Sequence, residues 1–309
     1  IMVETFNSFG QRLLDEHYDK IGFSAAPVLI DEILKKDIIV GLLEKHRTLP
    51  LDYRNPFLNL PSASGAVTQI VRIIDQMKAY HVEYEAQAEN LLPSDLKPRA
   101  DEVLAIYKEY NQILLDKNLI DFEDQLRLIL QLKPYGVFRD IPYEHIVVDE
   151  FQDSDPNQIN LILELARAAQ TLKSIVVVGD ELQAIYSFRN ATPDNLINFS
   201  SYFPGMIDIP LQDNFRSQSP IIAMANRILT KTAKIATVIR ANRTEKGLDP
   251  VLLKIEEEDK ERNLYVRQVK KMLMQGTNPK DIAILCRTKT ELSKMQKALD
   301  DDGIPTILR

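Results

Sequence analysis

Acidic residues follow two short runs of β-branched residues in this sequence. Asp149 and Glu150 come directly after His145–Val148, and Asp180 comes two residues after Ser174–Val178. Such runs, with a helical pattern between them, are typical of parallel strands that are buried on both faces. Parallel strands end at the same edge of a sheet, where α/β proteins bind ligands. We therefore expect the two groups of carboxylates to lie side by side.

These side chains have the chemistry that phosphoryl transfer requires. Asp149 is placed to hold Mg²⁺ through water, and Glu150 to polarise an attacking water. Gln183 carries an amide that both donates and accepts, which suits it to sensing a phosphate or a water. A simpler interpretation stays open, in which the acidic loop only caps the next helix, with Asp153 or Ser154 as its N-cap.

Two further segments combine rings and cations. Tyr186, Phe188 and Arg189 suit base stacking and phosphate binding, or else the rings are core residues and Arg189 forms a surface ion pair. Arg216 follows a strand-like stretch, Ile207–Leu211, from which an arginine can reach a triphosphate. The alternative there is a loop capped by an asparagine.

Composition limits the class of protein. The 309 residues are 45% hydrophobic and 27% charged, which indicates folded domains, with room for two, and argues against disorder. No apolar run approaches the roughly 20 residues of a membrane span, and no signal-peptide pattern is visible. The single cysteine, Cys286, excludes an internal disulfide, and the four histidines lack ligand spacing. These features predict a cytoplasmic protein.

The net charge of −7 means that any binding of nucleic acid depends on stacking or on a local basic patch. Residues 231–246 form one candidate patch, with five cations against Glu245; the alternative is a solvated surface. The positioning elements follow from periodicity, which predicts mostly helix over residues 11–132. Elements predicted beyond residue 150 are helices over Gln158–Ala169, Pro220–Thr230 and Asp259–Gln275, strands over Val251–Ile255 and Asp281–Cys286, and a final helix through Leu299 that ends at Gly303.

Taken together, the three chemical segments resemble the UvrD/Rep family of superfamily 1 DNA helicases. DEFQD at residues 149–153 is similar to the family's motif II, GDELQAIYSFRNA at 179–191 to its motif III, and LQDNFRS at 211–217 to its motif IV. Weaker similarities connect TFNSFG at 5–10 with the family's TFHSF segment and DFEDQL at 121–126 with its DFxDLL box. Residues 281–287, with Gly303 to Pro305 behind them, resemble the first strand unit of the second motor domain.

The resemblance implies roles at the nucleotide. Asp149 would hold Mg²⁺, Glu150 would activate the hydrolytic water and Gln183 would sense the γ-phosphate. Arg216 would stabilise developing charge from the second motor domain. Asp180 and Phe215 would bind the nucleotide, with Phe215 stacking on adenine where the family usually has Tyr. The implied cofactors are ATP and Mg²⁺.

The resemblance also implies DNA contacts. Residues with this role would be Thr5, Phe6, Tyr186, Phe188 and Arg189. Phe188 stands where the family usually has Trp, but a Phe ring still stacks on bases. Asn7 in place of His and Asn190 in place of Gly are further departures that bear on local DNA contacts. The implied partners are single-stranded or partly duplex DNA and repair or replication proteins, with no membrane.

The implied fold is α/β, a partial RecA-like P-loop NTPase motor core. Residues 1–15 and 116–210 would form part of the first RecA-like domain, 16–115 an inserted helical subdomain, and 211–309 the start of a second RecA-like domain. The implied function is part of an ATP-dependent helicase that moves 3′ to 5′ on single-stranded DNA.

One family motif has no counterpart here. None of the ten glycines is followed by lysine, so the phosphate-binding G-x-x-x-x-G-K-[ST] loop is missing, and the second motor domain stops before its later motifs. We therefore expect a fragment that is inactive by itself. Two alternatives stay open: a non-catalytic helicase-like module that binds DNA or a protein, and a metal-dependent nuclease built on Asp149, Glu150 and Asp180.

Overall fold

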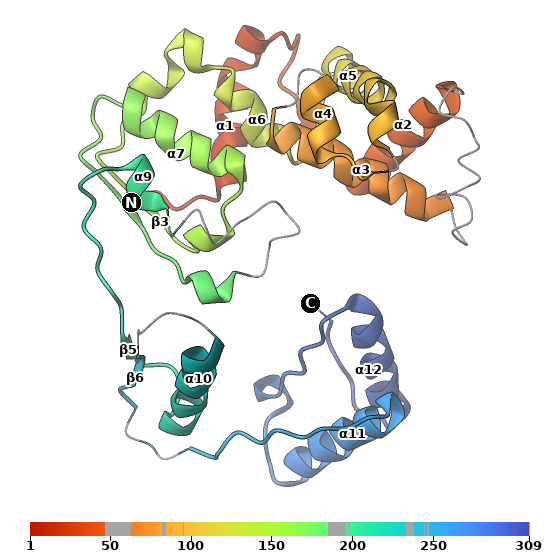
Figure 1. The fold of residues 1–309 in the computed structure, drawn as a ribbon, viewed down its shortest axis with the longest axis vertical. Coiled ribbons are helices and arrows are strands. Elements are labelled where there is room, and N and C mark those ends of the chain that lie inside the picture. The colour runs from red at the N-terminus through yellow and green to blue at the C-terminus, as the bar shows by residue number, and fades with distance from the viewer. Residues whose placement is uncertain are drawn as a thin grey trace. The chain divides into compact units, whose positions relative to one another are not determined.

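The computed structural model describes residues 1–46, 63–81, 85–94, 96–184, 196, 198–232, 238–243, 245 and 247–308. The chain forms two compact units, Ile1–Ile207 and Asp208–Arg309. Figure 1 shows the elements of both units in colours that follow the sequence. No helix in the described ranges combines the length and the apolar character that a bilayer crossing requires.

Part of the first unit is a helical bundle with its own core. Its helices are α2 (Glu32–Lys45), α3 (Ala63–Ala79), α4 (Glu85–Leu91) and α5 (Ala100–Asp116). Apolar residues that recur every three or four positions bring Ile39, Ile74, Met77 and Ile106 into one buried cluster. The bundle appears in orange and yellow in Figure 1. The predicted helical character of residues 11–132 is confirmed in the described part of that range.

The rest of the first unit carries the acidic segments. Its helices are α1 (Phe6–His17), α6 (Asp124–Leu130), α7 (Pro156–Ala168) and α9 (Phe199–Tyr202), and its strands are β1 (Val28–Leu29), β2 (Leu119–Ile120), β3 (His145–Val148) and β4 (Ser174–Val177). Helix α1 packs on α6, and α6 packs on α7. Their shared core includes Leu14, Ile129, Phe138 and Leu161. The helix predicted between the two strands is confirmed as α7.

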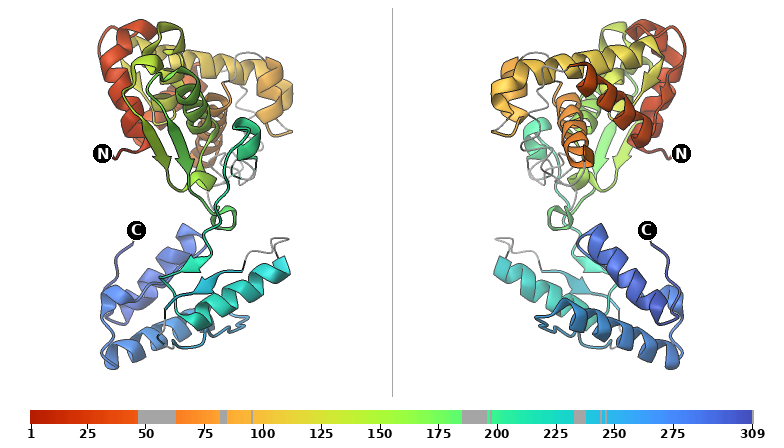
Figure 2. Two further views of the ribbon diagram at one scale, coloured as in Figure 1. Left: turned by 90° about the vertical axis from the view of Figure 1, so that its left-hand side faces the viewer. Right: turned by 90° about the vertical axis from the view of Figure 1, so that its right-hand side faces the viewer.

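Strands β3 and β4 pair in parallel, from His145 opposite Ser174 to Val148 opposite Val177. Figure 2 shows the two green arrows side by side and pointing the same way. This confirms the predicted parallel pair. Burial on both faces was wrong, because Val147 is 70% exposed and Val176 is 47% exposed. Only one face of the pair packs against α7, so alternate residues point away from that core.

Short 3₁₀ helices connect several of these elements. They span Tyr18–Ile21, Lys97–Arg99, Lys133–Tyr135, Val137–Asp140, Phe151–Asp153, Glu181–Gln183 and Pro279–Asp281. Strands β1 and β2 also pair in parallel, with Val28 opposite Leu119.

The second unit contains the predicted helices of the C-terminal region. They are α10 (Ser219–Thr232), α11 (Glu258–Met274) and α12 (Lys289–Asp301), with strands β5 (Asp213–Asn214) and β6 (Arg240–Ala241) paired in parallel. Val266 and Val269 of α11 pack on Met295 and Leu299 of α12. The last helix was predicted to end at Gly303. It ends at Asp301, and Gly303 just behind it has a left-handed backbone at φ +74°.

Three predicted extended segments of this region are not paired strands. Val251–Ile255 and Ile207–Leu211 have no ladder partner among the described residues, and Val251 and Leu211 are each 79% exposed. Asp281–Cys286 was expected to be a buried strand, but it pairs with no strand in the part of the chain that the structure describes. Leu285 is 94% exposed, while Ile284 packs on the α11–α12 core. Apolar and β-branched residues favour extended backbone, but a strand forms only where a second strand supplies hydrogen bonds.

A buried ionic cluster joins the helical bundle to the start of α6. The ammonium of Lys78 in α3 donates to Asp121 and to Asp124, each at 2.7 Å. Lys35 of α2 lies 3.2 Å from Asp121, and the hydroxyl of Tyr110 in α5 donates to the same carboxylate at 2.9 Å. All four charged groups are at least 98% buried. Three bundle helices are therefore held by two carboxylates from the DFEDQL segment.

The opposite charges in this cluster stabilise one another's ionised forms. Burial alone would raise the pKa of Asp121, but the attraction of Lys78 and Lys35 outweighs it and lowers that pKa. Burial likewise opposes the charge on Lys35, but Asp121 and Asp75 outweigh it and raise its pKa. Asp121 and Lys35 therefore stay ionised at neutral pH.

Glu123, beside this cluster, gives a prediction on pH. Burial, together with repulsion from Asp75 and Asp155, raises the pKa of Glu123 to about 7. Because the folded state binds this proton more tightly than the unfolded state, stability is lost as the pH rises from about 4.5 to about 7. We expect Glu123→Gln to remove this loss, which amounts to roughly 2 to 3 kcal/mol. Urea unfolding at pH 5 and pH 8 measures it.

The matched control is Glu89→Gln, which removes an exposed carboxylate from α4. This variant should keep the pH dependence of the parent chain. If Glu123→Gln and the parent lose the same stability between pH 5 and pH 8, the carboxyl of Glu123 does not titrate in that range.

Candidate functional site

The loops that follow β3 and β4 meet at the carboxyl ends of the two strands. The backbone N–H of Val178 donates to the carbonyl of Val148 at 2.8 Å, and the N–H of Phe151 donates to the carbonyl of Val178 at 2.9 Å. These bonds continue the parallel ladder past its last paired residues. The expectation that the two acidic segments lie side by side is therefore confirmed by the backbone.

Glu150 adopts a backbone conformation that is uncommon for a residue with a side chain. Its φ of 52° and ψ of 39° lie in the left-handed region. The N–H of Glu150 donates to the carboxylate of Asp149 at 2.9 Å, and both side chains are exposed at the edge of the sheet. Such conformations cost of order 1–3 kcal/mol and occur often at functional sites.

Gln152, a residue for which the sequence pattern predicted no role, connects the two loops. Its side-chain amide N–H donates to the Glu150 carboxylate at 2.7 Å, and its amide oxygen accepts the backbone N–H of Asp180 at 3.0 Å. Gln152 is only 1% exposed. The signal that would have found it is its place in DEFQD, where a polar side chain between Phe151 and Asp153 faces the neighbouring loop.

Asp180 organises the second loop. Its carboxylate accepts the backbone N–H of Leu182 at 3.0 Å and the side-chain amide of Gln183 at 2.7 Å. Gln183 itself is exposed. The structure thus brings Glu150, Gln152, Asp180 and Gln183 into one hydrogen-bonded series.

The alternative role of the acidic loop, that of a helix cap, belongs to a different residue. Asp155 is the N-cap of α7: its carboxylate accepts the N–H of Gln158 at 2.9 Å, and the side chain of Gln158 accepts the N–H of Asp155. The N-cap predicted at Asp153 or Ser154 was wrong. The cap lies immediately before Pro156 because Pro takes the first helical position readily.

The residues expected to bind DNA are only partly described. Tyr186, Phe188, Arg189 and Asn190 lie outside the described residues. Thr5 is the N-cap of α1, its hydroxyl accepting the N–H of Ser8 at 3.1 Å. The remaining candidate is Phe6, a half-buried residue that packs against the core.

Asn7, which stands where the family pattern has His, pairs with another departure from the pattern. Its side-chain amide donates to the side-chain oxygen of Gln125 at 2.9 Å, and Gln125 stands where the DFxDLL box has its first Leu. Gln125 donates in turn to Gln11 at 3.0 Å. The two exchanged residues thus satisfy each other's polar groups.

Phe215 and Arg216 belong to the second unit, where both are exposed. The side-chain oxygen of Asn214 accepts the N–H groups of Arg216 and Ser217, at 3.0 and 2.7 Å. The alternative of a loop capped by asparagine is therefore correct for the backbone here. This turn leaves the Arg216 side chain free to contact a ligand.

Two cations of the basic segment are paired with carboxylates. Arg240 pairs with Asp213 at 3.0 Å, and Arg243 pairs with Glu245 and also donates to the carbonyl of Arg216 at 3.1 Å. Lys234 and Lys246 lie outside the described residues.

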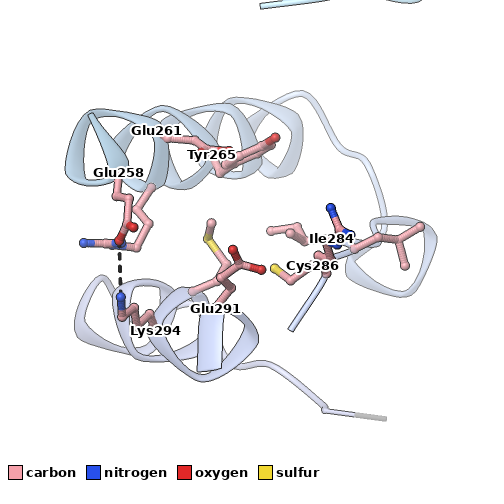
Figure 3. A pocket seen from close by; sticks show the side chains of 11 residues that line it. Glu258, Glu261, Tyr265, Ile284, Cys286, Glu291 and Lys294 are labelled. Atoms are coloured by element: carbon pink, nitrogen blue, oxygen red, sulfur yellow. Dashed lines mark hydrogen bonds and ion pairs between the residues drawn. The ribbon is translucent and has the colours of Figure 1, made fainter. Parts of the chain in front are cut away.

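A pocket in the second unit lies between α11 and α12 (Figure 3). Glu258 and Lys294 form an ion pair at 3.2 Å on one side of it, and Ile284 and Cys286 line another. None of the predicted chemical residues lines this pocket.

Comparison with known families shows to which family these segments belong. A family model described as the UvrD/REP helicase N-terminal domain matches residues 1–204, and one described as the UvrD-like helicase C-terminal domain matches residues 209–309. The chain belongs to the UvrD/Rep helicase family. Membership implies a RecA-like helicase fold, of which the described residues show helices and small parallel sheets. The resemblance inferred from the motifs is therefore confirmed.

Curated UvrD/Rep-type relatives are longer than this chain. YjcD of Bacillus subtilis strain 168 is 29% identical over 228 residues, which are 69% of this chain and 29% of YjcD. The ATP-dependent DNA helicase srs2 of Schizosaccharomyces pombe is 28% identical over 321 residues, covering 97% of this chain and 34% of srs2. The ATP-dependent DNA helicase PcrA of B. subtilis is 24% identical over 312 residues, which are 98% of this chain and 40% of PcrA.

Proposed function

We propose that these 309 residues form part of an ATP-dependent DNA helicase that couples ATP hydrolysis to 3′–5′ movement along single-stranded DNA. The observation that carries the proposal is the hydrogen-bonded connection from Glu150 through Gln152 to Asp180. This connection places the residue proposed to activate water and the loop proposed to sense phosphate in one arrangement. A helix cap alone does not require such a connection.

Asp149 is the proposed Mg²⁺ residue, acting through water. Mg²⁺ in nucleotide sites keeps several waters and takes one or two carboxylates together with phosphate oxygens. An exposed single carboxylate at the edge of the sheet fits that requirement, and no group of three His, Cys, Asp or Glu ligands occurs in the described part of the chain. When bound with ATP, Mg²⁺ would neutralise charge on the transferred phosphoryl group.

The other site residues have separate proposed roles in catalysis and nucleotide binding. Glu150 orients and deprotonates the attacking water, and Gln183 contacts the γ-phosphate. Arg216 stabilises the charge that develops there, and Phe215 and Asp180 bind the nucleotide.

On the DNA side, Thr5, Phe6, Tyr186, Phe188 and Arg189 contact single-stranded or partly duplex DNA. Repair or replication proteins are the proposed partners. The 309 residues alone do not hydrolyse ATP under this proposal, because no Gly-Lys-Ser/Thr loop grips the phosphates.

Binding of single-stranded DNA tests the proposal on this chain. We expect fluorescence anisotropy to show binding that weakens as salt increases, with log K falling by about 0.7 per phosphate contact for each tenfold increase. The paired state of Arg240 and Arg243 predicts a shallow dependence, of roughly two to three contacts. Lys231→Gln combined with Arg243→Gln should make the slope shallower still.

The matched control is Lys271→Gln, which removes an exposed cation from α11 outside the basic segment. It should leave the salt dependence unchanged. Absence of any salt-sensitive DNA binding by the parent chain would remove residues 231–246 from the proposed DNA surface.

A further inference from the structure

We propose that Gln152 is a positioning residue. It holds the Glu150 carboxylate and couples changes in the hydrogen bonding of that carboxylate to Asp180 and Gln183. The inference rests on the proposed function for its consequence in catalysis, but its structural part concerns only this chain. Gln152 touches no reacting atom in this scheme. It acts through the residues on either side of it.

The orientation of the Gln152 amide is fixed by its partners. A carboxylate only accepts hydrogen bonds and a backbone N–H only donates, so the NH₂ must face Glu150 and the oxygen must face Asp180. Both bonds are of normal length, at 2.7 and 3.0 Å. At 1% exposure, water cannot readily replace either partner.

Gly179 shows how closely the second loop approaches this amide. A Cβ atom at Gly179 would lie 2.6 Å from the Gln152 side-chain oxygen and 3.2 Å from its backbone nitrogen. A side chain at residue 179 would therefore displace Gln152. This close approach explains the glycine at residue 179. Its backbone is not in the left-handed region, so the backbone conformation alone does not call for glycine.

Glu150 needs an external restraint that Gln152 supplies. Its side chain is exposed and projects from a left-handed backbone, so few neighbours restrict its rotamers. The charge-assisted bond from Gln152 is the short contact that orients it, and such bonds are stronger than neutral ones. The same amide then fixes Asp180, whose carboxylate holds Gln183.

The series therefore runs from the proposed water-activating group to the proposed phosphate sensor. A change in the hydrogen bonding of Glu150, such as engagement of a water, alters the donor strength of the Gln152 amide. This alters its hold on the Asp180 N–H, because linked hydrogen bonds polarise one another. Asp180 is 30 residues from Glu150 in sequence, yet a single side chain separates their bonded groups.

Amide hydrogen exchange by NMR on the 309-residue chain tests this connection. Glu150→Ala removes an exposed carboxylate and releases one side of Gln152, so exchange at the Asp180 amide should rise about threefold or more. Gln152→Met keeps the side-chain length, removes both bonds and should raise it about tenfold. The Val178 amide, bonded to Val148, reports opening of the strand pair and should not change.

The decisive measurement is the double variant. If Gln152 carries the connection, Glu150→Ala causes no further rise in Asp180 exchange in a Gln152→Met chain. The proposal would be overturned if the two substitutions multiplied their effects on the exchange rate of the Asp180 amide. It would also be overturned if Glu150→Ala left that rate unchanged. Should Gln152→Met also unprotect Val178, the Glu150→Ala result alone decides. Glu144→Ala, at the opposite end of β3, is the control and should leave Asp180 unchanged.

A kinetic test addresses the consequence in catalysis. In the product of the complete gene, Gln152→Met should lower kcat for DNA-stimulated ATP hydrolysis about tenfold or more while KM for ATP stays within about twofold. An unchanged kcat would contradict the positioning role. Absence of hydrolysis by the unsubstituted gene product would instead contradict the proposed function, and the exchange result on the 309-residue chain would stand independently.

Discussion

Replacing Glu150 by glutamine is expected to abolish ATP turnover by the product of the complete gene while leaving nucleotide binding intact. Glutamine has the same shape but accepts no proton, so only the activation of water is lost. General-base catalysis contributes about 10² to 10⁴ in rate, and we expect kcat to fall by that factor. Steady-state phosphate release measures turnover, and a fluorescent ATP analogue measures binding.

Two controls make this result specific. Glu181→Gln removes a neighbouring carboxylate of the second loop that takes no part in the hydrogen-bonded series from Glu150 to Gln183, and it should change kcat by less than about threefold. The 309-residue chain should show no turnover, with or without single-stranded DNA. A kcat that Glu150→Gln lowers by less than about tenfold would remove Glu150 from its proposed role. A gene product that binds DNA without hydrolysis would favour the non-catalytic module.

Replacing Lys78 by methionine is expected to lower the free energy of unfolding of the first unit by about 3–5 kcal/mol. Methionine matches the length of lysine but leaves Asp121 and Asp124 without the cation that contacts both. Lys35 still contacts Asp121 and Arg127 still contacts Asp124, which favours the lower end of that range. Urea unfolding followed by helical circular dichroism measures the change.

The matched control is Lys173→Met, which breaks a 2.8 Å ion pair with Glu144 whose two side chains are 63% and 57% exposed. Exposed pairs contribute about 0–1 kcal/mol, so this variant should stay near the parent. Equal effects of the two substitutions would mean that the buried cluster gives no more stability than a surface pair. Because Asp121 has a lowered pKa, the cluster should also lose its contribution as acid protonates that carboxylate.

Much of the fold was predictable because local pattern is sufficient for helices. Helices α7, α10, α11 and α12 lie where apolar spacing placed them, because helical hydrogen bonds are local. The segments Val251–Ile255 and Asp281–Cys286 failed as strands because the ladder bonds of a strand come from elsewhere in the chain. The cap at Asp155 was missed by one residue, since Asp153, Ser154 and Asp155 are all good N-cap types.

The candidate site divides in the same way. Asp149, Glu150, Asp180 and Gln183 were found from their types and from the strands before them, and family membership was evident from motif order. Gln152 was overlooked because its proposed positioning role depends on a hydrogen bond from the backbone N–H of Asp180, 28 residues away in the sequence. The roles of the site residues and the domain boundaries stay predictions.

The sequence by itself determined the helices, the parallel pair of strands and the family, because these depend on short-range periodicity and on residue order. Tertiary structure alone decided which polar groups meet. It placed Lys35 and Lys78 inside the protein, where a sequence pattern would leave lysines in water, because Asp121 and Asp124 offset their desolvation. It also joined Glu150 to Asp180 through Gln152, since hydrogen bonds form between neighbours in space whatever their separation along the chain.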